Sequence, residues 1–291
     1  MLEQTGLVFE VGGRRYVDGE QIGGGGLANV YSAVDKETGE VVAIKVYKRF
    51  IDSFEKTLRN SIRVHELVGG LSSRLPKLHC KGENSYVMDF IDGVNLRNTQ
   101  FPDETTVLTV GYDVAVCLVD LHENLPDPII HRDVKPSNIV LRHDGVSVLV
   151  DFDFAYVDIL SEHSAAENVG TAKFLSPEQF EHSQIKPKSD VFSLGSTMYN
   201  LLTGQYLREP HVRLVIEAAL DKLPQGRPRD IVARCWRVGT EYRDAFFLSE
   251  DIRNALEESG VDIEESRRAL AQLVKVSNRD LDVDDLHEIV G

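Results

Sequence analysis

Hydrophobic and polar residues alternate along much of the N-terminal part of the chain, with the period of two that is typical of β-strands. Gly12 and Gly13 join the first two alternating segments, and such a pair favours a tight hairpin turn. Residues 51–71 instead carry hydrophobic residues at helical spacing. The pattern predicts a small region of β-strands with one helix. The expected strands are residues 8–11, 14–17, 30–35, 41–46 and 85–88.

Further along the chain, the hydrophobic positions recur every three or four residues, as in α-helices that bury one face. Residues 103–106, DETT, begin a long helix of this kind. Ser189 and Asp190 begin another, which ends at Gly204 and is hydrophobic on most faces, as expected for a helix in the centre of a core. Further helices are expected over residues 212–223, 229–238 and 248–256, and over 263–274 in an acidic C-terminal stretch.

The composition limits the classes of partner. The chain of 291 residues has 47 acidic and 32 basic residues, a net charge of −15, and no basic cluster, which argues against a nucleic-acid partner. No hydrophobic run reaches the roughly 18 residues of a membrane span, and the N-terminus lacks the features of a signal peptide. Three scattered cysteines suit neither a disulfide framework nor a zinc site. We therefore expect a soluble cytoplasmic protein without a membrane or nucleic-acid partner.

A short stretch between a predicted helix and a predicted hairpin gathers chemically active side chains. It comprises residues 131–138, HRDVKPSN, and is followed further on by Asp151. The stretch and Asp151 supply two carboxylates, a lysine and an asparagine. This set suits phosphoryl transfer from a nucleotide–metal complex to a hydroxyl, because one carboxylate can orient the hydroxyl while the other, with the asparagine, holds Mg²⁺.

A second candidate site lies in the strand region. Glycines at residues 23–26 can bring backbone N–H groups close to phosphate oxygens, although a flexible turn has the same composition. Lys45 lies inside a following strand, and a buried lysine requires an anionic partner. Glu55 and Glu66 of the predicted helix are both candidates, and the spacing to Pro76 favours Glu66. The alternative is an edge-strand lysine that faces water.

In this order, the motifs resemble those of the eukaryotic-like (Hanks-type) serine/threonine protein kinase family, from about Leu7 to Leu256. The lysine two residues after Asp133 resembles the Ser/Thr branch rather than the tyrosine branch or the small-molecule kinases. The matching motifs are the glycine-rich loop at 23–30, the strand motif ending at Lys45, the gatekeeper Met88 with the hinge 89–93, the catalytic loop 131–138, the metal motif Asp151-Phe152, Gly170-Thr171 and Ser176-Pro177-Glu178 of the activation segment, Asp190 as the brace of the catalytic loop, and Arg243 as the partner of Glu178.

The resemblance implies an α+β, bilobal protein-kinase-like fold. It comprises a small β-rich N-lobe with the N-terminal hairpin over residues 1–89, a larger helical C-lobe over 90–257 and an acidic helical extension over 258–291. It also implies a Mg-ATP-dependent enzyme that transfers the γ-phosphoryl group to Ser/Thr hydroxyls of protein substrates. The alternative is a pseudokinase that uses the fold as a nucleotide-binding or scaffold module.

The resemblance further implies the role of each site residue. Asp133 would orient the hydroxyl and accept its proton, and Lys135 would stabilise the transferring phosphoryl group. Asn138 and Asp151 would bind Mg²⁺ or Mn²⁺, while Lys45, paired with Glu66, would hold the α- and β-phosphates of ATP. The other nucleotide contacts are expected from Ile22, Gly23, Gly24, Gly25, Gly26, Val30, Ala43, Met88, Asp89, Ile91 and Val140.

The chain departs from the family pattern at three positions. Ala28 replaces the third loop glycine, and Asp89 replaces a common glutamate at the hinge. Asp153 replaces the glycine after Asp151-Phe152. Asp153 either raises Mg²⁺ affinity, restricts a flip of Phe152, or is simply accommodated because aspartate tolerates unusual backbone angles. Ala28 and Asp153 are the features that favour the pseudokinase alternative.

Two finer hypotheses concern regulation and substrate choice. In the family, an arginine at the position of Arg132 normally implies an activation loop ordered by a phosphorylated residue, four positions before the threonine of Gly170-Thr171. Here that position is Glu167. We expect Glu167 to supply a permanent charge, with Ser161 or Ser164 as the alternative regulatory sites. The positions where basic-directed kinases carry acids are neutral here, so we expect no strong preference for basic peptides. These positions are Asn95, Ser137 and Asn200.

Overall fold

The computed structural model divides the chain into two compact units. Unit 1 holds the described residues up to Ile91 and also the segment Asp151–Phe154. Unit 2 holds the described residues from Asp92 to Val150 and from Ala155 onward, including those of the C-terminal extension. The structure describes residues 6–49, 54–101, 103–157, 170–181, 183 and 185–277.

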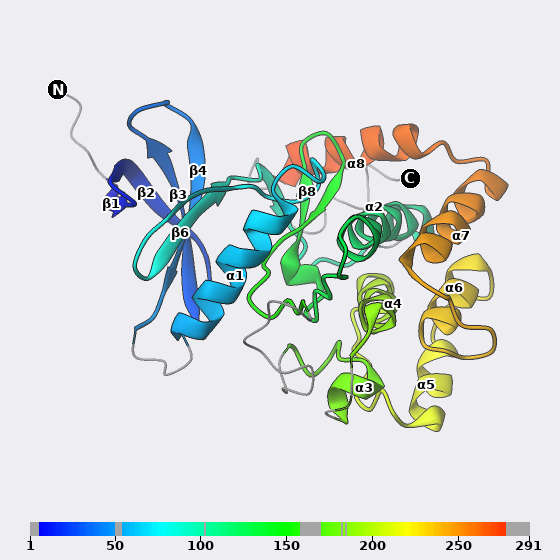
Figure 1. The fold of residues 1–291 in the computed structure, drawn as a ribbon. Helices are drawn as coiled ribbons and strands as arrows, with labels where there is room; N and C mark the ends of the chain where they lie inside the picture. The colour runs from blue at the N-terminus through cyan, green and yellow to red at the C-terminus, as the bar shows by residue number, and fades with distance from the viewer. Residues whose placement is uncertain are drawn as a thin grey trace. The chain divides into compact units, whose positions relative to one another are not determined.

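Unit 1 is built on an antiparallel sheet of six strands in the order β1-β2-β3-β4-β6-β5 (Figure 1). The predicted hairpin at the N-terminus is confirmed, and Gly12 and Gly13 take positive φ angles of 56° and 80° in its turn. Strand β5 has only four residues and was not predicted. The elements of unit 1 are β1 (Leu7–Val11), β2 (Arg14–Gly24), β3 (Ala28–Asp35), β4 (Val41–Tyr47), α1 (Phe54–Val68), β5 (Leu78–Lys81) and β6 (Ser85–Asp89).

The period of two along β4 sends its side chains to opposite faces of the sheet. Val42 and Ile44 belong to one buried cluster. Ala43 and Tyr47 belong to the other cluster, which also contains Leu58 of α1. Lys45 lies between Ala43 and Tyr47 in this alternation, so the strand directs it to the face that α1 covers.

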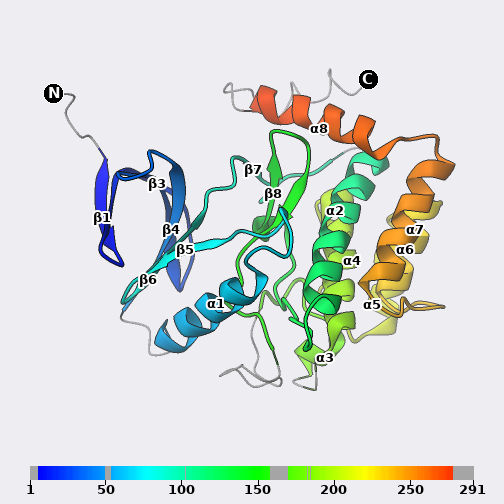
Figure 2. The same cartoon turned by 45° about the horizontal axis from the view of Figure 1, so that its top comes forward.

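Unit 2 is mainly helical, and Figure 2 shows α2, α4, α6 and α7 side by side. Helix α2 begins at the predicted DETT run, where the side chain of Asp103 caps it by accepting a hydrogen bond of 2.6 Å from Thr106 N. The core helix α4 begins at Pro187, two residues before the predicted start, and ends at Gly204 with φ 67°. The elements are β7 (Gly93–Asn95), α2 (Glu104–Glu123), the 3₁₀ turn η1 (Pro136–Asn138), β8 (Ile139–Arg142), β9 (Ser147–Leu149), α3 (Pro177–Phe180), α4 (Pro187–Thr203), α5 (Arg213–Leu220), α6 (Arg227–Cys235), α7 (Ala245–Glu258) and α8 (Ile263–Ser277).

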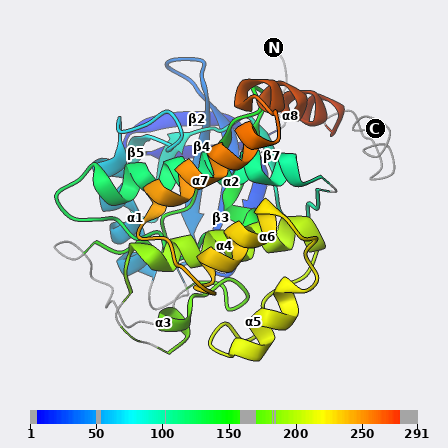
Figure 3. The ribbon, with the colours of Figure 1, turned by 90° about the vertical axis from the view of Figure 1, so that its right-hand side faces the viewer.

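Helix α2 is the centre of unit 2. In the part of the chain that the structure describes, it is the one helix with the length and hydropathy of a membrane span. However, 72% of its most hydrophobic 18-residue segment is buried within the protein. Helix α8 packs against it: Ser266 Oγ lies 2.7 Å from Thr109 Oγ1, and Arg267 forms an ion pair with the buried Asp113. Figure 3 shows α8 and α5 at opposite ends of unit 2. The described part of the C-terminal extension is therefore an integral element of unit 2.

Candidate active site

The loop that carries the expected catalytic residues is held by one buried carboxylate. Asp190 of α4 accepts hydrogen bonds from the backbone N–H groups of His131 (2.7 Å) and Arg132 (2.8 Å), and its Oδ2 lies 2.9 Å from His122 Nε2. Arg132 has a φ of 68°, a conformation that costs energy for a side chain of its size. The expected brace is confirmed, because Asp190 fixes the loop in this strained shape.

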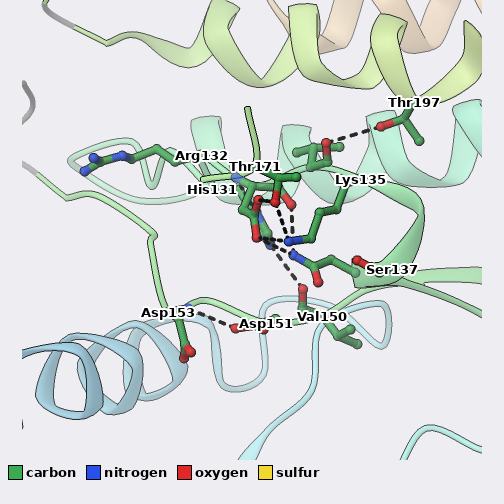
Figure 4. A network of polar contacts seen from close by, with 12 residues as sticks. His131, Arg132, Lys135, Ser137, Val150, Asp151, Asp153, Thr171 and Thr197 are labelled. Atoms are coloured by element: carbon green, nitrogen blue, oxygen red, sulfur yellow. Dashed lines mark hydrogen bonds and ion pairs between the residues drawn. The ribbon is translucent and has the colours of Figure 1, made fainter. Parts of the chain in front are cut away.

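Two residues of the loop, Asp133 and Lys135, contact each other and Thr171. Figure 4 shows Lys135 and Thr171 side by side. Lys135 Nζ lies 2.7 Å from Asp133 Oδ2 and donates a 2.6 Å hydrogen bond to Thr171 Oγ1. Thr171 in turn donates a 2.9 Å hydrogen bond to Asp133 Oδ1. Here a carboxylate accepts a hydrogen bond from a hydroxyl group, and a lysine lies beside both. General-base activation of a hydroxyl needs a carboxylate within hydrogen-bond reach of it. The sequence placed Thr171 in the activation segment but did not predict this contact.

Asn138 also contacts Asp133. Its amide nitrogen donates to the backbone oxygen (2.9 Å) and to Oδ2 (3.0 Å) of Asp133, which directs the amide oxygen away from them. Its backbone oxygen accepts a 2.8 Å hydrogen bond from Val150 N, and Asp151 is the next residue. Amide and carboxylate oxygens are hard ligands that suit Mg²⁺. The chemistry of Asn138 and Asp151 therefore fits the implied metal ion.

Lys45 is paired with two carboxylates of the segment that follows β9. Its Nζ lies 2.7 Å from Asp151 Oδ1 and 2.7 Å from Asp153 Oδ1. Burial alone would lower the pKa of Lys45, but the charges of Asp151 and Asp153 outweigh it and raise this pKa above its ordinary value. The predicted anionic environment of Lys45 is present within unit 1, and Lys45 stays charged.

The predicted pair between Lys45 and Glu66 is wrong. Glu66 forms an ion pair of 2.9 Å with Lys81 of β5, and its side chain is 48% exposed. The reason is the register of α1, which buries Ser61 and His65 and turns the next residue, Glu66, toward solvent. The spacing to Pro76 did not define which face of the helix packs on the sheet.

Asp153 is a buried residue with defined partners. Its Oδ1 accepts a short hydrogen bond from Tyr47 OH, in addition to the ion pair with Lys45. Burial raises the pKa of Asp153, as does the charge of Asp151, while Lys45 lowers it. The left-handed backbone conformation occurs at Asp151, with φ 73°, and not at Asp153. Tolerance of unusual backbone angles therefore does not explain the aspartate at position 153.

Helix α1 contacts Phe152 through a histidine that sequence reasoning missed. The ring centroids of His65 and Phe152 are 4.9 Å apart, and both side chains are fully buried. His65 Nδ1 lies 2.8 Å from Ser61 O, whereas its Nε2 has no hydrogen-bond partner among the described residues. Burial lowers the pKa of His65 to about 4. His65 is therefore a neutral core residue that holds Phe152 against α1.

Several expected nucleotide contacts share one surface of unit 1. Ala43 is the register partner of Met88, and Val30 is the partner of Lys45. Val30, Ala43 and Met88 belong to one hydrophobic cluster. Ile22 is exposed, and Gly23–Gly26 form the end of β2 and the turn into β3.

Three other residues expected to contact the nucleotide, Asp89, Ile91 and Val140, do not belong to this cluster. The carboxylate of Asp89 accepts a 2.9 Å hydrogen bond from Lys77 N, just before strand β5, and lies 2.6 Å from Nε2 of His79 in that strand. Val140 belongs to unit 2, where it pairs with Asn95 and Val148. Ile91 is the last residue of unit 1 before the boundary.

Glu178 is held by a different arginine from the one predicted. Arg237 donates hydrogen bonds of 2.9 Å and 2.7 Å to its two carboxylate oxygens, and Ser189 donates a third at 2.6 Å. Although burial acts in the opposite direction, these contacts lower the pKa of Glu178. Arg243 instead binds its neighbour Asp244 at 2.8 Å. The φ of 61° at Arg237 turns the chain after α6, which the sequence did not indicate.

The residues of the two finer hypotheses have different outcomes. Glu167, Ser161 and Ser164 lie outside the described residues, so that hypothesis stays a prediction. Asn95 donates a 2.8 Å hydrogen bond to Ser137 O, which links two of the neutral positions.

The chain matches the protein kinase domain family over residues 16–225, and it belongs to this family. This confirms the predicted α+β kinase fold and the predicted resemblance to Ser/Thr protein kinases. Members of this family use ATP and a divalent metal ion.

Curated relatives carry the same family name. The chain is 31% identical over 223 residues to a probable serine/threonine-protein kinase of Streptomyces coelicolor, which covers 69% of this chain and 31% of that protein. It is 32% identical over 207 residues to the serine/threonine-protein kinase PknB of Mycobacterium tuberculosis, which covers 66% of this chain and 33% of PknB. The chain thus spans about a third of the length of these relatives.

Proposed function

We propose that this chain transfers the γ-phosphoryl group of ATP to Ser or Thr hydroxyls of protein substrates, with Mg²⁺ as its metal ion. The observation that carries the proposal is the cluster of Asp133, Lys135 and Thr171. In it, a carboxylate accepts a hydrogen bond from a threonine hydroxyl beside a lysine. The family membership and the names of the relatives support the same activity.

The reaction assigns one task to each residue of the catalytic loop. The substrate oxygen attacks the γ-phosphorus, the bond from that phosphorus to the β–γ bridging oxygen breaks, and the hydroxyl proton passes to the carboxylate of Asp133. Lys135 neutralises the charge that builds on the transferring group. The 2.9 Å hydrogen bond from Thr171 Oγ1 to Asp133 supports this role, because it holds a hydroxyl against the same carboxylate.

The contacts with the nucleotide and its ion are assigned to individual residues, as the family resemblance implies. Asn138 and Asp151 would hold Mg²⁺, which neutralises phosphate charge when bound. Lys45 would bind the α- and β-phosphates, and backbone N–H groups of the glycine-rich turn at 23–26 would line the triphosphate. The hydrophobic cluster of unit 1 would take the adenine. A cytoplasmic location and the absence of nucleic-acid and membrane partners belong to the same proposal.

The proposal is tested by transfer of ³²P from γ-labelled ATP to a generic protein substrate. We expect Asp133→Ala to lower the rate by about 10²- to 10⁴-fold, the usual contribution of a positioned base. Asp35→Asn, which changes a buried aspartate of unit 1 that pairs with Arg14, serves as a control and should keep the rate. EDTA should abolish transfer, and Mg²⁺ should restore it more fully than Mn²⁺. A chain that binds ATP but transfers no phosphate would instead be a pseudokinase.

A further inference from the structure

The helix that packs on the Lys45 face of the sheet offers Lys45 no carboxylate. Helix α1 has two acidic residues, and neither is among its buried residues. Glu55 lies 3.5 Å from Arg59, and Glu66 lies 2.9 Å from Lys81. The buried face of α1 instead presents Ser61, whose Oγ lies 3.0 Å from Tyr86 OH. The anion that a buried lysine requires must come from elsewhere in unit 1.

As the anion that neutralises Lys45, Asp153 is held more firmly than Asp151. The side chain of Asp153 is 6% exposed, whereas that of Asp151 is 37% exposed. Tyr47, which is fully buried, donates a hydrogen bond to Asp153, and the ring of Tyr47 lies 5.5 Å from Lys45 Nζ. Two residues of strand β4 therefore hold one carboxylate between them.

The two carboxylates are suited to different tasks. The more exposed Asp151 can turn an oxygen toward a metal ion, and its Oδ1 also accepts a 3.2 Å hydrogen bond from Asp153 N. The carboxylate of Asp153 already binds a cation and a phenol donor inside the protein. If Asp151 were the sole partner of Lys45, the lysine would compete directly with the metal ion for that carboxylate.

We propose that Asp153 is the residue that positions Lys45 for the phosphates of ATP, and that Tyr47 holds Asp153 in place. The inference rests on the proposed function for the role of Lys45, but the contacts that carry it are present within unit 1. Asp153 thus takes the part that the family resemblance assigned to a carboxylate on helix α1.

The first test compares Asp153→Asn with Glu66→Gln. The control variant also loses one carboxylate, but at an exposed residue that pairs with Lys81 and does not contact Lys45. Both variants are assayed for ATP affinity by titration calorimetry and for steady-state kinetics. We expect Asp153→Asn to raise the KM for ATP and lower kcat/KM for ATP by at least about tenfold, as for the loss of one buried charge-assisted hydrogen bond. The KM for the protein substrate should not change, and Glu66→Gln should match the wild type. Equal effects of the two variants would overturn the proposal.

A milder variant covers the case in which Asp153→Asn fails to fold. Tyr47→Phe removes only the hydroxyl that binds Asp153 and keeps the ring. It should shift the KM for ATP in the same direction by a smaller factor, and an unchanged KM would contradict the role of Tyr47. If excess Mg²⁺ fully restores Asp153→Asn, then Asp153 acts as a metal ligand, and the proposal is wrong.

The last test does not depend on kinase activity. A double-mutant cycle on the free energy of unfolding combines Lys45→Met with Asp153→Asn, and a second cycle combines Lys45→Met with Glu66→Gln. We expect the first pair to lose less stability than the sum of its single variants, and the second pair to be additive. Additivity in the first cycle would overturn the contact, whereas an inactive wild type with a coupled first cycle would overturn only the proposed function.

Discussion

The buried His65 predicts that unit 1 loses stability in mild acid. Its pKa is lowered from 6.5 to about 4 in the folded protein, because burial disfavours the charged ring. Between these values the unfolded chain binds a proton more readily than the folded chain, so the free energy of unfolding falls as the pH falls. The contribution is fully present above about pH 6.5. By linkage, about 2 kcal/mol is lost by pH 5 and about 3 kcal/mol at most.

The assay is urea unfolding followed by circular dichroism at several pH values between 4.5 and 7.5, because Trp236, the one tryptophan, reports on unit 2 rather than unit 1. The matched variant is His65→Leu, which fills much of the same space among Tyr86 and Phe152 but cannot be protonated. Carboxylates titrate in both proteins, so the difference between the two curves isolates the histidine. Parallel curves for the wild type and His65→Leu would refute the reasoning.

Three further predictions follow from other contacts. Arg237→Ala should lower the free energy of unfolding by about 2 kcal/mol, since it removes a two-pronged ion pair from the half-buried Glu178, whereas Arg243→Ala should leave it unchanged in thermal melts. Arg267→Met should cost about 3 kcal/mol and raise amide hydrogen exchange in α8, because the fully buried Asp113 loses its cation; unchanged exchange would contradict this. A peptide array should show no dominant arginine before the phosphosite, because Asn95, Ser137 and Asn200 are neutral.

The sequence predicted those features that depend on short-range pattern. The alternation of residues 41–46 predicted β4 and the inward direction of Lys45, and the spacing of hydrophobic residues predicted the helices to within a few residues. The motif at residues 131–138 predicted that Asp133, Lys135 and Asn138 share one loop, but it did not predict the contacts among them or the hydrogen bond from Thr171. Strands β5 and β7, with four and three residues, are too short to show a period.

Features that depend on which face of an element packs inward were not predictable in the same way. Adjacent residues on a helix differ by about 100° in direction, so a shift of one position separates the buried His65 from the exposed Glu66. In the same way, Arg237 and Arg243 are six positions apart, and the chain turns at Arg237, with φ 61°, where this residue contacts Glu178. Candidate partners of equal charge can be recognised from sequence, but tertiary packing selects among them.

Asp153 neutralises the buried Lys45 in a protein whose helix α1 presents no carboxylate to that lysine. A buried lysine must be neutralised by a nearby anion, and this requirement could be stated from the sequence of β4 alone. The sequence could not show that the anion comes from the segment after β9, because the contact between positions 45 and 153 depends on the folding of unit 1. With Ser61 on the buried face of α1, an uncharged residue at 153 would leave Lys45 to Asp151 alone. The aspartate at position 153 therefore compensates for the absence of a carboxylate on that face of α1.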